Sequence, residues 1–83
     1  MKISVKYRAK LAALTKVASE SIDAVNVKDV LKHIKNHFGA EAEKLAKTML
    51  IVVNGQSTIL LKAYKTMLKD GDEVGFLPIC GGG

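Results

Sequence analysis

The residues with the clearest chemical potential in this sequence are the three glycines at its carboxyl end, Gly81, Gly82 and Gly83. A glycine end is the thinnest peptide there is, so it can enter a narrow channel of a partner protein and present the α-carboxylate of Gly83 to a reagent. A carboxylate is a poor electrophile until it is activated, for example as an acyl-adenylate. From composition alone, this interpretation and a frayed terminus are equally good.

Three side chains could add a nucleophile or metal ligands. Cys80 has no basic residue among the last 13 residues to lower its pKa, so we expect it to pack as an apolar residue. The alternative for Cys80 is capture of an activated Gly83 carbonyl. His33 and His37 have the four-residue spacing of a shared metal site, but no third ligand is evident, and we expect no metal.

The acidic residues Asp70, Asp72 and Glu73 surround a glycine near the end of the chain. A calcium loop would need a longer series of oxygen ligands closed by a glutamate, so a hairpin turn explains these residues better. The terminal glycines also cannot form a phosphate-binding loop, because such a loop needs a helix after it.

The elements that must position the glycine end begin with two strands. Apolar and polar residues alternate over residues 2–7, which predicts a half-buried strand. A second alternation over residues 19–25 predicts a strand that forms a hairpin with the first. Residues 8–15 between them could turn helical, but they have the length of a connector.

One amphipathic helix is the best-determined element. Asn26 stands at the N-cap position, Asp29 supplies negative charge to the first turn, and Gly39 ends the helix. The apolar residues of the helix recur at the helical period and are Val27, Val30, Leu31, Ile34 and Phe38. Residues 40–48 can add a short second helix.

The second half of the chain predicts more strands. The apolar run of residues 49–53 predicts a strand that is buried on both faces in the middle of a sheet. Asn54-Gly55 is a strong turn signal, and residues 56–61 can return as a short strand. Residues 62–67 are ambiguous.

The last predicted strand leads directly into the glycine end. It covers residues 73–77, follows a tight turn at Asp70-Gly71, and ends at Pro78. We therefore expect an α+β domain over residues 1–78, with one main helix covering a mixed sheet of four or five strands. Residues 79–83 are expected to form a flexible tail.

Composition limits the function classes. The chain has 83 residues, 48% of them apolar, and a formal charge of +5, which suits one small folded domain with no separate cofactor domain. A single cysteine and the absence of a signal peptide or a membrane-spanning run predict a soluble cytoplasmic protein. Twelve lysines and one arginine are spread along the chain, so a solubilising surface is favoured over an acidic protein partner, and nucleic acid comes third.

The segment from Leu68 to Gly83 (LKDGDEVGFLPICGGG) resembles the closing segment of the ubiquitin-like sulfur carriers, in particular the small subunit of molybdopterin synthase. Chains of that family typically end with Leu-Lys-Asp-Gly-Asp-Glu-Val, a short apolar strand, Pro-Pro and Gly-Gly. Val53-Asn54-Gly55 and the helix opening at residues 27–31 also match. The resemblance covers essentially the whole chain in order and length.

This resemblance implies a β-grasp fold and chemistry at the carboxyl end. A ubiquitin-activating-type enzyme would use ATP to adenylate the carboxylate of Gly83. A sulfur donor, such as a cysteine desulfurase or a rhodanese-like protein, would allow its conversion to a thiocarboxylate, and Gly82 would complete the Gly-Gly pair that threads the active sites. The tail would then enter the large subunit of molybdopterin synthase and give its sulfur to cyclic pyranopterin monophosphate. The chain would bind no cofactor and would not be catalytic alone.

The family also implies that partners meet the sheet face opposite the helix, near the tail. We expect Phe76, Cys80 and Gly81 at these contacts, with core packing as the alternative for Phe76. The chain departs from the family pattern at Ile79, where a second proline is usual, and at Cys80 and Gly81. These departures leave several acceptors open, including molybdopterin synthesis and sulfur transfer to tRNA or thiamine.

Two other function classes remain beside the sulfur carrier. A small protein modifier would be activated in the same way and then joined through Gly83 to lysines of target proteins. A basic binding module with an inert tail would be unaffected by deletion of Gly82 and Gly83.

Overall fold

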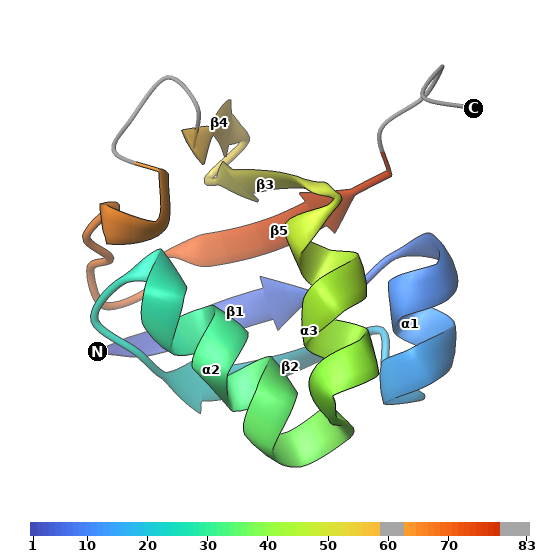
Figure 1. Cartoon of the computed structure of the whole chain (residues 1–83). Coiled ribbons are helices and arrows are strands. Elements are labelled where there is room, and N and C mark those ends of the chain that lie inside the picture. Colours follow the sequence, from blue (N-terminus) through green and yellow to red (C-terminus); the bar gives the residue numbers. More distant parts are fainter. Residues whose placement is uncertain (59–62, 79–83) are drawn as a thin grey trace.

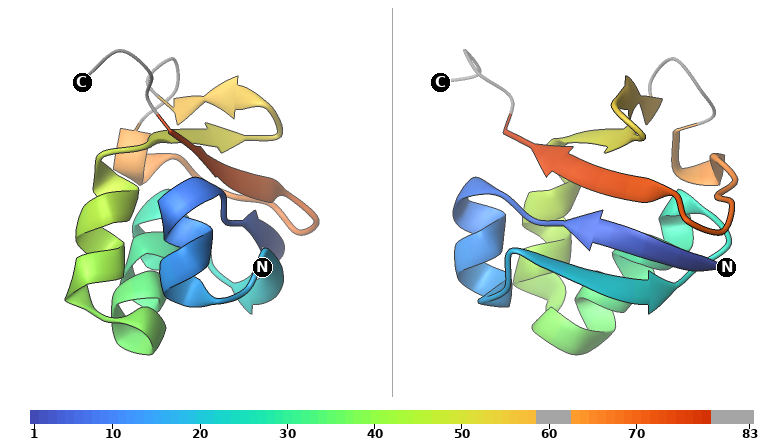
Figure 2. Two further views of the ribbon diagram at one scale, coloured as in Figure 1. Left: turned by 90° about the vertical axis from the view of Figure 1, so that its right-hand side faces the viewer. Right: turned by 180° about the vertical axis from the view of Figure 1, so that it is seen from behind.

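The computed structural model describes residues 1–58 and 63–78. Five strands form one mixed sheet in the order β2-β1-β5-β3-β4. The described α-helices lie on one face of this sheet (Figure 1 and the left view of Figure 2). The elements are β1 (Lys2–Lys6), α1 (Ala9–Thr15), β2 (Ser19–Asp23), α2 (Val27–Phe38), α3 (Ala40–Lys47), β3 (Leu50–Val53), β4 (Gln56–Ser57), the 3-10 helix η2 (Ala63–Lys65) and β5 (Glu73–Leu77). The expected α+β, β-grasp fold is confirmed. The described residues form three α-helices, where one main helix and a short second helix were expected.

The connection between the first two strands is helical. β1 and β2 pair antiparallel as predicted, but α1 stands where a plain connector was favoured. Its alanines, leucines and lysine are strong helix formers, and it buries Leu11 and Thr15, which lie one turn apart. The helix ends at Lys16, whose left-handed backbone (φ 63°) lets its N–H donate to the carbonyl of Ala12 at 2.8 Å. Two turns are too short for a periodic pattern to separate a helix from a loop.

Helix α2 forms as the sequence predicts. The amide of Asp29 donates to Oδ1 of Asn26 at 2.8 Å, and Oδ2 of Asp29 accepts from the amide of Val25 at 3.1 Å. This reciprocal pair satisfies two backbone donors at the start of the helix. Gly39, with φ 100°, ends α2, and the predicted second helix α3 begins at the next residue.

Strand β3 differs from the prediction in its burial. It was expected to be covered on both faces, but only Ile51 and Val53 are buried, while Leu50 and Val52 are half-exposed. The reason is that the described helices cover one face of the sheet, so the other face of β3 meets none of them (Figure 2). The centre of the sheet is β5, and β3 lies between β5 and the two-residue strand β4.

Two turns fix the start of β5. Asn54 and Gly55 both have positive φ (52° and 83°), as the Asn-Gly pair predicts. The side-chain Oδ1 of Asn54 accepts a 2.9 Å hydrogen bond from the backbone N–H of Glu73. The backbone N–H of Asn54 donates to the backbone carbonyl of Glu73 at 2.8 Å. In the predicted turn before β5, the amide of Gly71 donates to the carbonyl of Lys2 at 2.8 Å. Both turns therefore attach the beginning of β5 to neighbouring strands.

The core fills the space between the sheet and the helices. Its largest fully buried side chain is Phe76, whose ring stacks on Tyr7 with the ring centroids 6.1 Å apart. The predicted α2 stripe is buried here, apart from Phe38, which packs against the core half-buried. No helix within residues 1–58 and 63–78 is long and apolar enough to cross a membrane.

Candidate functional site

Strand β5 carries the chain toward its carboxyl end. It pairs parallel with β1 and antiparallel with β3, so it is held by a hydrogen-bonded neighbour on each side. It ends at Leu77, directly before Pro78, as predicted. Cys80, Gly81, Gly82 and Gly83 lie outside the described residues. The site that can be described is therefore the surface around the end of β5.

Phe76 does not lie on that surface. Its ring is fully buried under the helices, so the alternative of core packing holds for Phe76 and the expected partner contact does not. Side chains alternate between the faces of a strand, and Phe76 shares its face with the fully buried Val74. The next residue, Leu77, points to the open face and is half-exposed.

The open face of the sheet is apolar next to the end of β5. Leu77 pairs with Leu50, and Gly75 pairs with Val52 across the β5–β3 ladder. Gly75 leaves a shallow hollow of about 210 Å³, which is lined by Lys6, Arg8, Val52, Gly55, Glu73, Gly75 and Leu77. The right view of Figure 2 shows this side of the sheet, with β5 between β1 and β3.

Gly75 shapes the floor of the hollow. A Cβ at this position would lie 3.2 Å from Cγ2 of Val52, which is closer than ordinary van der Waals contact. A larger residue at position 75 would therefore displace the side chain of Val52 and fill the hollow over β5. Sequence analysis missed Leu50, Val52, Gly75 and Leu77. The signal that could have found them is the alternation within β5, which puts Val74 and Phe76 together on the core side.

Charged groups stand at the β1 edge of the hollow. Nζ of Lys6 lies 3.2 Å from Oε2 of Glu73, and both side chains are more than 40% exposed. The exposed Arg8 follows at the end of β1. An apolar patch with a charged edge is typical of a surface that binds another protein.

The acidic residues of the turn have structural partners. Oδ1 of Asp70 accepts from the amide of Lys2 at 2.8 Å. Oδ2 of Asp72 accepts from the amide of Lys69 at 2.8 Å, and its Oδ1 accepts from the side-chain amide of Asn54 at 2.9 Å. The Lys69 bond, followed by the Asn54 bond, lowers the pKa of Asp72. These contacts confirm a turn in which the carboxylates hold backbone groups. It is not the predicted hairpin turn, because β5 pairs with β1 and β3 and not with the segment directly before the turn.

The two histidines of α2 lie beside Glu20 of β2, where His33 joins a hydrogen-bonded cluster and His37 stacks on His33. Nε2 of His33 lies 3.1 Å from Oε2 of Glu20, and the same oxygen accepts a 2.5 Å hydrogen bond from the hydroxyl of Tyr7. The ring of His33 stacks on His37 with a centroid distance of 4.2 Å. Burial, followed by the hydrogen bond to Glu20, raises the pKa of Tyr7. Among the described residues, no group of three or more His, Cys, Asp or Glu side chains could hold a metal.

Comparisons with known proteins agree with this architecture. The model of the ThiS family matches residues 5–83. The small archaeal modifier protein 1 of Methanosarcina acetivorans superimposes with a TM-score of 0.88 at 25% identity, over 99% of this chain and 96% of the other. A comparison with curated proteins finds no match.

Two further solved structures are similar. A Pyrococcus furiosus protein described as subunit 1 of the molybdopterin converting factor has 28% identity and a TM-score of 0.72, over 94% of this chain and 97% of the other. The complex of subunits 1 and 2 of the molybdopterin-converting factor from Helicobacter pylori matches with a TM-score of 0.71 at 24% identity, over 99% of this chain and 100% of the other.

Proposed function

The chain belongs to the ThiS family of ubiquitin-like sulfur carriers, and on this premise we propose that it supplies sulfur for molybdopterin synthesis through a thiocarboxylate at Gly83. The observation that carries the choice of pathway is the 28% identity to the Pyrococcus furiosus protein, which extends over 94% of this chain. The family match includes Gly83 itself.

The proposed chemistry needs two partners before the acceptor. An adenylating enzyme joins the Gly83 carboxylate to the AMP part of ATP and releases pyrophosphate. The terminal sulfur of a persulfide on the donor protein then displaces AMP and forms an acyl disulfide. A second thiol cleaves the S–S bond, which releases the thiocarboxylate of Gly83 and leaves a disulfide on the donor side. ATP is bound by the activating enzyme, and this chain contributes the carboxylate.

The open face of the sheet supports a carrier role. Leu77, Leu50 and Val52 form an apolar surface beside the strand that leads to the carboxyl end. A partner that covers this surface would bind close to the point from which the glycine end departs. We propose that the activating enzyme and a large subunit of the molybdopterin synthase type use this surface in turn.

Intact-mass spectrometry tests the carrier chemistry. The full chain is incubated with ATP, its cognate activating enzyme and a sulfur donor. We expect a mass increase that equals replacement of one oxygen by sulfur, mapped to Gly83. A variant that lacks both Gly82 and Gly83, and therefore has no terminal Gly-Gly pair, and a reaction without ATP are the controls, and neither should gain mass. An unchanged wild-type mass, with an enzyme proven active on another carrier, would contradict the proposal.

A second candidate function is conjugation to other proteins. The observation in its favour is the small archaeal modifier protein 1, which matches nearly the full length of both chains with a TM-score of 0.88. In that case the activated Gly83 would form an amide with the amino group of a target lysine.

The two candidates differ in their acceptors, which can be measured. A molybdopterin synthase large subunit that co-purifies with the chain and forms product favours the first candidate. Conjugation would leave a branch on target lysines after trypsin digestion. Because no Lys or Arg follows Lys69, that branch would be residues 70–83 rather than a Gly-Gly remnant. A mass search for this branch in cells, with the variant that lacks Gly82 and Gly83 as control, distinguishes the candidates.

A further inference from the structure

The helices of the folded chain carry its excess positive charge. Helices α1, α2 and α3, with their cap residues, contain eight basic side chains and three carboxylates, which accounts for the whole formal charge of +5. The basic residues are Arg8, Lys10, Lys16, Lys28, Lys32, Lys35, Lys44 and Lys47. The rest of the chain is formally neutral, so the helices and their caps carry the excess charge, although Arg8 also lines the hollow on the open face.

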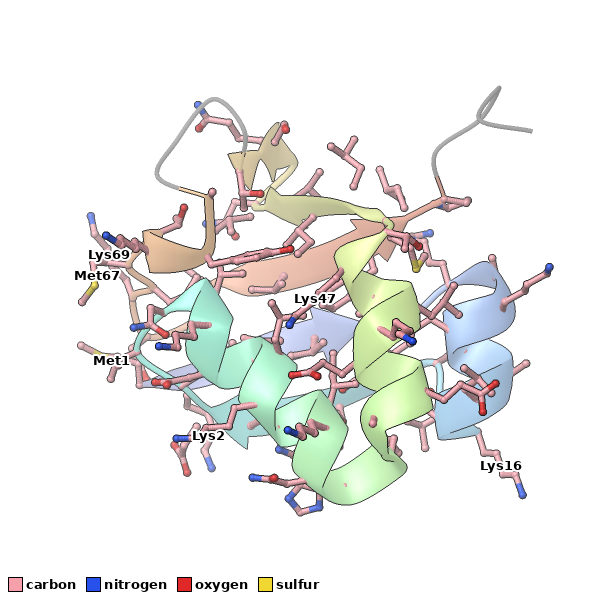
Figure 3. The ribbon with its side chains drawn as sticks, in the orientation of Figure 1. Met1, Lys2, Lys16, Lys47, Met67 and Lys69 are labelled. Atoms are coloured by element: carbon pink, nitrogen blue, oxygen red, sulfur yellow. The ribbon has the colours of Figure 1, made fainter. Side chains whose placement is uncertain are left out.

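A groove runs along this side between α2, α3 and η2. It has a volume of about 570 Å³, and its lining includes Lys28, Lys32, Lys35 and Lys47. Figure 3 shows Lys47 on the helical side, between α2 and α3. Tyr64, which is 41% exposed, adds an aromatic ring to the lining.

The three groove lysines of α2 have no salt-bridge partner among the described residues. Lys28, Lys32 and Lys35 follow one another at four and three residues on α2, so they form a row about 10 Å long. Within the described part of the chain, none of these three side chains forms a salt bridge. The sheet lysines differ, because Nζ of Lys2 lies 3.8 Å from Asp23 and Nζ of Lys6 lies 3.2 Å from Glu73.

The two carboxylates of the groove are already engaged. Oδ2 of Asp29 accepts from the amide of Val25 at 3.1 Å, as part of the helix cap. Oε2 of Glu43 lies 4.0 Å from Nζ of Lys47 on the same helix. Among the described residues, neither carboxylate forms a salt bridge with Lys28, Lys32 or Lys35.

We propose that this groove is a docking surface for an acidic segment of a partner protein, separate from the open face of the sheet. Single ammonium groups at helical spacing match the carboxylates of an acidic helix laid along α2. A nucleic-acid phosphate backbone fits less well. Phosphate recognition favours the guanidinium fork of arginine, and the groove holds lysines together with the carboxylates of Asp29 and Glu43.

The two surfaces lie on opposite sides of the molecule. The groove is lined by residues of α2, α3 and η2. Helices α2 and α3 lie on the side of the sheet away from its open face (left view of Figure 2). A partner bound in the groove therefore leaves Leu77 and its neighbours accessible. This inference does not depend on the chemistry proposed for Gly83.

An NMR titration tests the proposal. The probe is a 15-residue helical peptide of alanine and glutamate, with the glutamates at four- and three-residue spacing, added to the ¹⁵N-labelled full chain at low salt. We expect shifts of the amides of α2, α3 and η2. The triple variant K28Q/K32Q/K35Q should bind about tenfold more weakly, since it loses three exposed ion pairs.

A matched variant separates the groove from overall charge. K2Q/K16Q/K69Q also removes three positive charges, at residues that lie at the edges of the molecule in Figure 3. It should weaken binding less than twofold. Equal weakening by both variants, or shifts confined to the open face, would overturn the proposal. Tighter binding of a 15-nucleotide RNA in the same groove would also overturn it, in favour of a nucleic-acid surface. Dispersed spectra of both variants confirm that the fold is kept.

Discussion

The two faces of the sheet differ in what lies against them. On one face, Val74 and Phe76 of β5 are fully buried beneath the helices. On the other, Glu73, Gly75 and Leu77 of the same strand form a shallow hollow with a charged edge. One strand therefore supplies both the centre of the core and the surface beside the carboxyl end. Substitutions at the adjacent residues Phe76 and Leu77 should therefore change the free energy of unfolding and the proposed partner binding separately.

Phe76→Ala should produce the largest effect. It removes the largest fully buried side chain, so the free energy of unfolding should fall by about 3–5 kcal/mol. Urea denaturation monitored by circular dichroism measures this change. Leu77→Ala, on the open face, is the matched control and should cost less than about 1 kcal/mol. Equal losses would contradict the assignment of the two residues to different faces.

Leu77→Asp tests the open face as a binding surface, on the premise of the proposed function. The binding free energy of this variant with the activating enzyme should weaken by about 2 kcal/mol, because a charge replaces an apolar contact on the open face. The affinity is measured by titration calorimetry. Leu14→Asp places the same charge at a 38% exposed leucine on α1 and should leave the affinity nearly unchanged. A similar loss of affinity in both variants would show that the activating enzyme does not bind the open face specifically.

Tyr7→Phe tests how much the hydrogen bond between Tyr7 and Glu20, on the covered face of the sheet, contributes to the free energy of unfolding. It removes the hydrogen bond to Glu20 and should cost about 1.5–3 kcal/mol near neutral pH. Because the pKa of Tyr7 is raised in the fold, its contribution is fully present below the ordinary tyrosine pKa of about 10 and is lost as the pH rises above it. Chemical denaturation between pH 7 and 11 should therefore show a steeper alkaline loss in the wild type. Parallel profiles would argue against this linkage.

Asp72→Asn should have the smallest effect, about 1 kcal/mol, because its contacts lie in an exposed turn. The pKa of Asp72 is lowered in the fold, so its contribution is present above the ordinary pKa of about 4 and is lost as the pH falls through the lowered value. The stability difference between wild type and variant should narrow between pH 5 and 2. A constant difference over this range would mean that the Asp72 charge is not involved.

Local signals predicted much of the fold. The Asn26 cap, the apolar stripe and Gly39 specified α2 to the residue, and the Asp70-Gly71 turn with Pro78 specified β5. Helix α1 was missed because two turns carry little periodicity. The candidate site was predicted less well. Phe76 was expected at a partner contact, with core packing as the alternative, although Phe76 and Val74 lie on the same face of β5 and are both apolar, which indicates the core.

The sequence by itself determined most of the elements, the turns at Asn54-Gly55 and Asp70-Gly71 and the resemblance to the sulfur carriers, because caps, turns and short motifs depend on neighbouring residues. Only the tertiary structure decided which face of the sheet the helices cover, and therefore that Leu77 and Val52 face outward. It also brought Lys47 of α3 into the same groove as the lysines of α2. Both results depend on how elements pack against one another, which no local spacing records.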